Sequence, residues 1–237
     1  MDYEGVWKRR KERERNSYRC LRQGAILGNL KSMKVLGRSQ SCAVVFRYSP
    51  IYDDQCLAAF DLLPKHERPY PDAKTTMAFM HRLEKDWRKN EQKVFNGIQE
   101  YSGVQWTTKE HICYVVGSGV PFSDPLTMPV FAPEAPIDYV SDVLCHELIH
   151  RNLIEPAFSA RWKRISAKLK KCYPTDTENA LVHVIVHAVH EQIFLNVFSE
   201  ERLKRDKRIM FVHPDYRRAW EIVEEAGSKN LIKTFLR

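Results

Sequence analysis

The sequence predicts an α+β fold, in which a small mixed β-sheet is followed by a mainly helical bundle. Two observations support this prediction. Short β-prone runs bounded by Gly, Pro or Ser lie in the first part of the chain. From Pro136 onward, long segments contain apolar residues that recur with the period of an α-helix. No internal repeat or low-complexity tract interrupts this layout.

The predicted strands come first. We expect one strand at 41–48, closed by a Ser-Pro pair, and a second at 111–116. A Gly/Pro/Ser-rich loop follows, and then a third extended piece at 127–131. Pro129 lies inside that piece and has no N–H to donate, which favours an edge strand or an irregular one.

The first predicted helix is long and covers 72–101, where apolar residues recur at spacings of three, four and seven. In the later helices, Asp138 is expected as an N-cap, and Thr175 with Glu178 matches a capping box. That capping box and the length of the segment favour a helix there over a Val-rich strand. The later helices are expected at 138–154, 157–171, 176–199, 215–226 and 229–236.

The chain has 237 residues, which suits one large domain with or without an appendage. Residues 1–40 are basic and sparsely apolar. We therefore expect a basic N-terminal appendage over 1–40 and one folded domain, the one that carries the motif described below, over 41–237.

Composition narrows the class of protein. The net charge of +8 is compatible with nucleic-acid binding, but the basic run at 8–22 interleaves Glu with Arg and Lys, which favours a solvated segment. The six cysteines form no C-x-x-C pair, which is typical of unpaired thiols in a reducing compartment. The N-terminus has no apolar leader, and no uncharged apolar run approaches the roughly 18 residues that span a membrane. We expect a soluble, cytoplasmic protein.

Three chemically active residues lie on the helix expected at 138–154, which should end before Pro156. His146 and His150 are four residues apart, so their imidazoles lie one turn apart on the same face and can reach one metal ion. Glu147 is adjacent in sequence, and its carboxylate can accept a proton from water bound to that ion rather than bind the metal.

This His-Glu-x-x-His pattern resembles the signature of the zincin metallopeptidases. The resemblance covers residues 146–150 and the order of the elements around them. It implies a Zn²⁺ ion with His146 and His150 as ligands and Glu147 as general base. The metzincin branch adds a Gly and a third His shortly after this pattern, whereas this chain continues with Arg151 and Asn152, so that branch does not fit.

A catalytic zinc usually has three protein ligands and a water. On the helix expected at 176–199, His183, His187 and Glu191 follow one another at steps of four, so they share one face. We prefer His187 as the third ligand, with His183 and Glu191 as alternatives, and Glu191 could instead orient a ligating histidine. A donor to the oxyanion of the reaction is also expected. Its candidates are His183, His190, Tyr173 and His213.

The expected function is zinc-dependent hydrolysis of peptide bonds, with an extended peptide or protein substrate added to an edge strand at 111–116 or 127–131. One alternative is another metal hydrolase, or a nucleic-acid-associated protease similar to the SprT-like family. The stretch 158–165 resembles that family in part, although the His-Gly expected before it is replaced by Glu155 and Pro156. The other alternative is a non-catalytic interaction module with a bound metal. The oligomeric state stays open.

Overall fold

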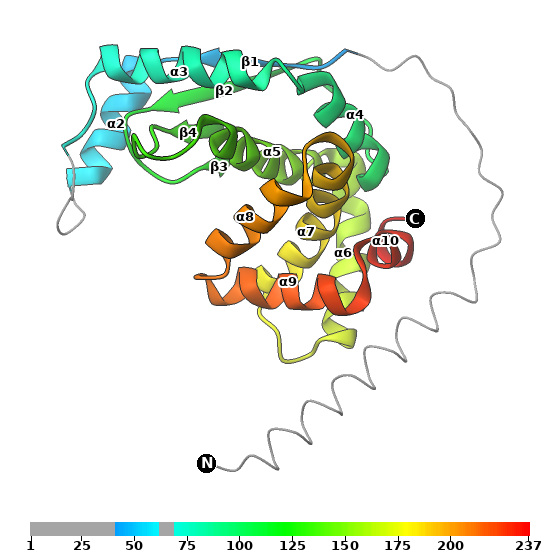
Figure 1. Cartoon of the computed structure of the whole chain (residues 1–237). Coiled ribbons are helices and arrows are strands. Elements are labelled where there is room, and N and C mark those ends of the chain that lie inside the picture. The colour runs from blue at the N-terminus through cyan, green and yellow to red at the C-terminus, as the bar shows by residue number, and fades with distance from the viewer. Residues whose placement is uncertain (1–40, 62–68) are drawn as a thin grey trace, which may run out of the picture.

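The computed structural model describes residues 41–61 and 69–237, so the expected basic appendage at 1–40 lies outside the described part of the chain. The fold is α+β, with a small mixed sheet and a larger helical part, as the sequence predicts (Figure 1). Within the described residues, one apolar core runs from the start of β1 to the C-terminal segment.

The sheet has four strands in the order β1-β2-β4-β3. β1 pairs in parallel with β2, β2 pairs in parallel with β4, and the short β3 pairs antiparallel with β4. The strands are β1 (Ala43–Arg47), β2 (Glu110–Val116), β3 (Phe122–Ser123) and β4 (Leu126–Pro129).

The segments expected to offer a free edge are therefore mostly internal. β2 is paired on both of its sides, so the expectation of an edge at 111–116 is wrong. β4 is covered by β3 opposite Leu126 and Thr127, and no strand among the described residues pairs with that side of Met128 and Pro129. Pro129 fits because it is the last residue of the ladder, where a missing N–H costs little.

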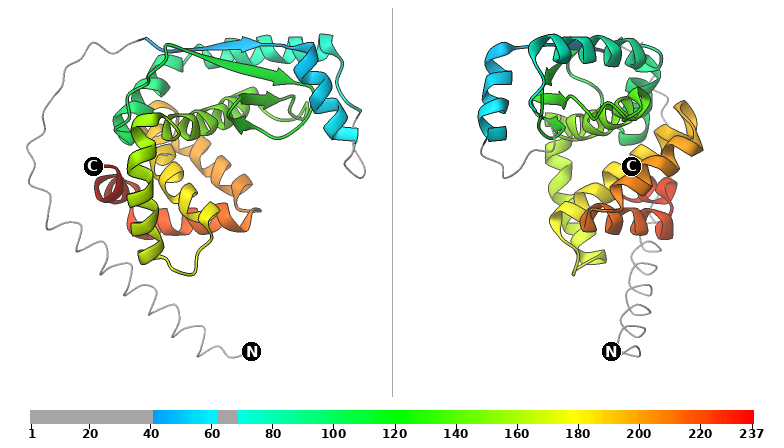
Figure 2. Two further views of the ribbon diagram at one scale, coloured as in Figure 1. Left: turned by 180° about the vertical axis from the view of Figure 1, so that it is seen from behind. Right: turned by 60° about the vertical axis from the view of Figure 1, so that its left-hand side comes forward.

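Helices surround this sheet and then form the bundle. α3 and α5 pack on the sheet and on each other, and α2 lies at the carboxyl ends of the strands (Figure 1). α5 also contacts α7 and α8, so it lies between the sheet and the bundle in both views of Figure 2. The helices are α2 (Pro50–Asp61), α3 (Ala73–Trp87), α4 (Glu91–Ser102), α5 (Ile137–Leu153), α6 (Pro156–Cys172), α7 (Glu178–Val197), α8 (Glu200–Met210), α9 (Pro214–Ala226) and α10 (Ser228–Leu231), with a π-helical turn η1 (Ile232–Leu236).

The single helix expected at 72–101 is two helices, and the break has a physical reason. Arg88 and Glu91 turn toward the outer edge of β1, the side of Val44 on which no strand pairs among the described residues. The Glu91 carboxylate accepts a hydrogen bond from the Val44 N–H at 2.8 Å, and the Arg88 guanidinium donates to the Val44 carbonyl at 2.9 Å. A continuous helix would leave these backbone groups of an edge strand unsatisfied.

Two helices were not expected from the sequence, and two expected caps are wrong. α2 begins with Pro50 in the first turn. α8 is a run of mostly charged residues with few apolar ones. α7 is capped by Thr177, whose hydroxyl accepts from Ala180 N, rather than by Thr175. Asp138 lies inside the first turn of α5 and pairs with Arg205 instead of capping the helix.

A buried carboxylate joins α2 to the end of β2. Asp53 accepts hydrogen bonds from the Tyr70 hydroxyl at 2.5 Å and from the Gly117 N–H at 2.7 Å. The ring of Tyr70 then covers Gly117 so closely that a Cβ there would lie 2.3 Å from Tyr70 Cε1. Only glycine fits this position, where the strand enters the loop before β3.

α7 is the central helix of the bundle, and it contacts α4, α5, α6, α8, α9 and α10. By length and composition α7 could cross a membrane. However, 72% of its most apolar stretch is buried inside the protein, as in the core helix of a globular domain. Among the cysteines of the described residues, Cys56, Cys113 and Cys145 form no disulfide.

Candidate metal centre

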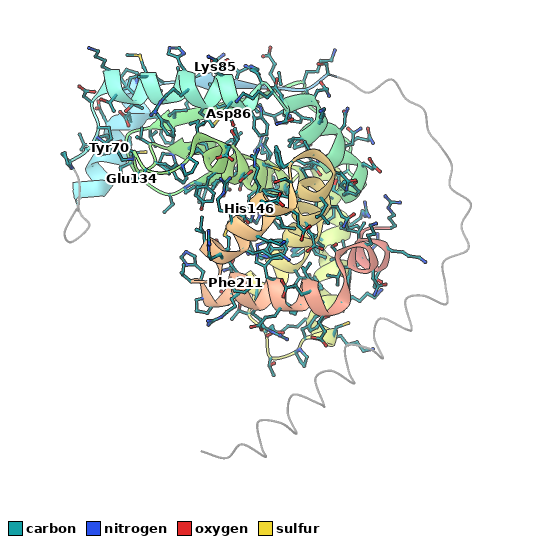
Figure 3. The ribbon with its side chains drawn as sticks, in the orientation of Figure 1. Tyr70, Lys85, Asp86, Glu134, His146 and Phe211 are labelled. Atoms are coloured by element: carbon teal, nitrogen blue, oxygen red, sulfur yellow. The ribbon has the colours of Figure 1, made fainter. Side chains whose placement is uncertain are left out.

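α5 carries the first two histidines. It is buried on most of its circumference, because it packs between the sheet and the bundle. His146 lies at this junction (Figure 3) and is 3% exposed, while His150 is half-buried. The Nε2 atoms of His146 and His150 are 3.1 Å apart. The helix and the one-turn spacing of this pair were predicted correctly.

α7 supplies a third histidine at the same point. One ring nitrogen each from His146, His150 and His183 lies within 4.8 Å of the other two. The His183 ring centroid is 4.9 Å from that of His150 and 5.6 Å from that of His146. His183 Nδ1 is 2.8 Å from the carbonyl oxygen of Asn179. Since a carbonyl only accepts, Nδ1 carries the proton, and Nε2 is left with a free lone pair.

The His146–His150 pair has the spacing that a metal site needs, and all three histidines have the required protonation state. Two nitrogens at roughly 2.0–2.1 Å from one tetrahedral ion are about 3.3 Å apart, close to the observed His146–His150 separation. Burial lowers the pKa of His146 and His183, and it lowers the pKa of His150 to about 3, with a further contribution from His183. The imidazoles are therefore neutral at physiological pH, which is the form that binds metals. The three histidines could hold one metal ion.

Glu147 directly follows His146 on α5. It is half-buried, and burial raises its pKa to about 7. Within the described part of the chain it has no hydrogen-bond or ion-pair partner. Most buried carboxylates are paired, so an unpaired one on the residue after His146 is available for chemistry.

Tyr216 completes the group, and sequence reasoning missed it. It lies in the first turn of α9, and its ring centroid is 4.2 Å from that of His183 and 6.4 Å from that of His146. Burial raises its pKa, and the Glu147 charge raises it further. The hydroxyl is therefore protonated at neutral pH and can donate a hydrogen bond. No local spacing links Tyr216 to the motif, because packing of α9 on α7 brings it there.

His187, the preferred third ligand, is not in this group. It is fully buried, and its ring stacks on that of Trp220 with centroids 4.3 Å apart and an interplanar angle of 12°. Neither of its ring nitrogens has a hydrogen-bond partner among the described residues. Four residues advance about 40° around a helix, so His187 points into the apolar contact with α9 while His183, one turn earlier, faces α5.

The remaining candidates lie elsewhere. Glu191 accepts hydrogen bonds from Lys207 Nζ at 3.0 Å and Ser228 Oγ at 2.5 Å, so it neither joins the histidine group nor orients a member of it. Tyr173 is buried beside the charged groups of Asp176 and Arg218. His213 is exposed, and its ring contacts Tyr216 at 5.2 Å.

His190 is the exception among these candidates. Its Nδ1 is 3.4 Å from Nδ1 of His146, on the opposite side of the His146 ring from the nitrogen that faces His150. Its own ring is fully buried. It therefore contacts one of the three clustered histidines without belonging to the cluster.

Comparisons with protein-family models, curated proteins and solved structures found no match for this chain.

Proposed function

We propose that this protein is a zinc-dependent metallopeptidase in which His146, His150 and His183 bind the metal and Glu147 is the general base. The observation that carries the proposal is the unpaired carboxylate of Glu147, the residue that follows His146, which is one of the three neutral histidines. A structural metal site needs only its ligands and gains nothing from a half-buried carboxylate without a partner. A hydrolase needs such a group.

A Zn²⁺ ion in this site would polarise a carbonyl group and lower the pKa of water to about 7. Glu147 accepts a proton from the attacking water and delivers it to the amine that leaves. Its raised pKa suits both steps, because the group exchanges a proton near neutral pH. The Tyr216 hydroxyl donates a hydrogen bond to the oxygen that becomes negative during the attack.

A peptide is the substrate class that the surroundings favour. β4 leaves Met128 and Pro129 without a strand partner on its outer side in the described part of the sheet. β4 also contacts α5, the helix of the metal-binding pair. An extended peptide added there would gain main-chain hydrogen bonds from the Met128 end of β4. Phe122, which is 53% exposed on β3, offers an apolar contact at the same edge.

The test compares the full chain with Glu147→Gln on an unfolded protein substrate, after both proteins are loaded with one equivalent of Zn²⁺. We expect hydrolysis by the parent protein and a loss of roughly 10²- to 10⁴-fold in the variant, the usual contribution of a general base. The control is Glu134→Gln, which changes an exposed glutamate in the loop before α5 and should keep full activity. A zinc-loaded parent that cleaves nothing, or a fully active Glu147→Gln, would refute the peptidase and leave a metal-binding module.

A further inference from the structure

Two more buried polar side chains, His190 and Asp206, lie on the side of His146 that faces away from His150. His190 of α7 faces His146 with a separation of 3.4 Å between their Nδ1 atoms. The other ring nitrogen of His190, Nε2, faces Asp206 Oδ2 of α8 at 3.9 Å. The side chains of His190 and Asp206 are 0% exposed. The three side chains come from three helices, so only the packed bundle brings them into line.

The protons of this row follow from the metal-binding role of His146. For Nε2 of His146 to offer a lone pair, its Nδ1 must carry the proton. That Nδ1–H then donates to Nδ1 of His190, which must be unprotonated. The proton of a neutral His190 is therefore on Nε2, where it points at the Asp206 carboxylate. Each member of the row fixes the tautomer of the one before it.

Without this row, the burial of the Asp206 carboxyl group has no structural explanation. Both of its carboxylate oxygens, and Nε2 of His190, have no hydrogen-bond partner in the described residues at the present separation. Its basic neighbours are already engaged, Arg205 with Asp142 and Lys207 with Glu191. A buried carboxyl group without partners costs the fold several kcal/mol. A shortening of about 1 Å would bring Nε2 and Oδ2 to hydrogen-bonding distance.

We propose that His190 and Asp206 are positioning residues that hold His146 in its Nδ1–H tautomer, so that Nε2 of His146 is always available to the metal. The inference rests on the metal site of the proposed function. It deepens that site by adding two residues that touch neither metal nor substrate. Groups of this kind typically change metal affinity by roughly 10- to 100-fold when they are removed.

The first test reads the tautomer directly, by ¹⁵N NMR of the histidine side chains in the metal-free full chain. We expect His146 to carry its proton on Nδ1 in the parent protein. In His190→Phe, which removes the acceptor but keeps an aromatic ring, we expect a mixture of both tautomers. A parent protein with the proton of His146 on Nε2 would overturn the proposal, and so would an unchanged tautomer in His190→Phe.

The second test measures Zn²⁺ affinity by competition with a chelator. We expect a 10- to 100-fold weaker affinity in His190→Phe and Asp206→Leu, and a partial recovery in Asp206→Asn, which keeps one acceptor oxygen. His187→Phe is the matched control, because it removes a buried α7 histidine outside the row and should leave the affinity unchanged. Equal affinities across the whole set would overturn the proposal.

These outcomes are separate from those of the peptidase test. The tautomer is read without metal or substrate, and the affinity is read without hydrolysis. A protein that binds Zn²⁺ through a correctly held His146 but cleaves nothing would refute the proposed activity and leave the positioning role intact. Each variant is checked for cooperative thermal unfolding. A parent protein with the proton of His146 on Nε2 overturns the proposal even where a variant does not fold.

Discussion

The imidazole of His187 lies flat on the indole of Trp220, with ring centroids 4.3 Å apart and neither ring nitrogen hydrogen-bonded to any described residue. Burial lowers the pKa of His187 well below its usual range, so the ring is neutral. In this position the imidazole packs as an apolar ring would. Its contribution to the fold is the stacking contact with α9, which a phenyl ring can replace.

His187→Phe is therefore expected to keep the stability of the parent protein within about 1 kcal/mol, because two unsatisfied buried nitrogens are removed while shape is retained. The free energy of unfolding in urea measures this. Trp220→Ala is the contrasting variant, with an expected loss of roughly 3–5 kcal/mol for a fully buried indole. A loss above about 2 kcal/mol in His187→Phe would show that its nitrogens have partners after all.

Asp142 anchors α5 to α8 one turn before His146. Its carboxylate, 0% exposed, pairs with the guanidinium groups of Arg202 and Arg205. Asp142→Ala would remove the fully buried partner of both cations, so we expect a loss of about 3 kcal/mol in the free energy of unfolding.

Asp138→Ala is the matched control, since Asp138 contacts the same arginines but is 37% exposed. Solvent screens that pair, and we expect a loss below about 1 kcal/mol. Equal losses in the two variants would contradict the idea that burial decides the strength of this contact.

The free energy of unfolding is expected to depend on pH through the titration of Asp206. Burial raises its pKa to about 7, and the negative charge of Asp142 adds to the shift. The unfolded chain has the ordinary carboxyl pKa of about 3.9. Between these two values the folded state binds the extra proton, so stability falls as the pH rises from about 4 to 7 and is level above that.

Asp206→Asn removes this titration. We expect the metal-free variant to gain stability over the parent protein progressively between pH 4 and 7, and to be more stable by a few kcal/mol at pH 8. Denaturant unfolding at a series of pH values measures the difference between the two proteins. A difference that does not change with pH would contradict the raised pKa.

A side chain at position 117 is expected to clash with Tyr70, outside the histidine cluster. Gly117→Ala would place Cβ 2.3 Å from the ring of Tyr70, whose hydroxyl is held by Asp53. We expect a loss of roughly 1–3 kcal/mol from this overpacking. In a Tyr70→Ala background the same substitution should cost much less, because the two changes share one contact. Strictly additive effects would contradict this account.

The parts of the site that were predictable are those set by local spacing. His146, Glu147 and His150 are neighbours within one helix, and the helix follows from its own apolar pattern. The choice between His183 and His187 could not be made in this way. Both lie on one face of α7, and only the rotation of α7 against α5 decides which of them reaches the two histidines of α5.

The residues that were missed depend on tertiary packing. Tyr216 and Asp206 come from α9 and α8, and no sequence period relates them to α5. The break between α3 and α4 is likewise invisible locally, because it serves the backbone of Val44 in a distant strand. The sequence pattern does not predict α8, because most of its residues are charged and only a narrow stripe that includes Leu203 is buried.

The central claim is that His146, His150 and His183 bind one metal ion. The most direct test is the metal content per chain, by elemental analysis after equilibration with a Zn²⁺ buffer, of the parent protein, His183→Phe and His187→Phe. The two variants remove histidines one turn apart on the same helix. The account predicts one ion in the parent protein, none in His183→Phe and one in His187→Phe. A parent protein without metal, or an ion that persists in His183→Phe and is lost from His187→Phe, would contradict it.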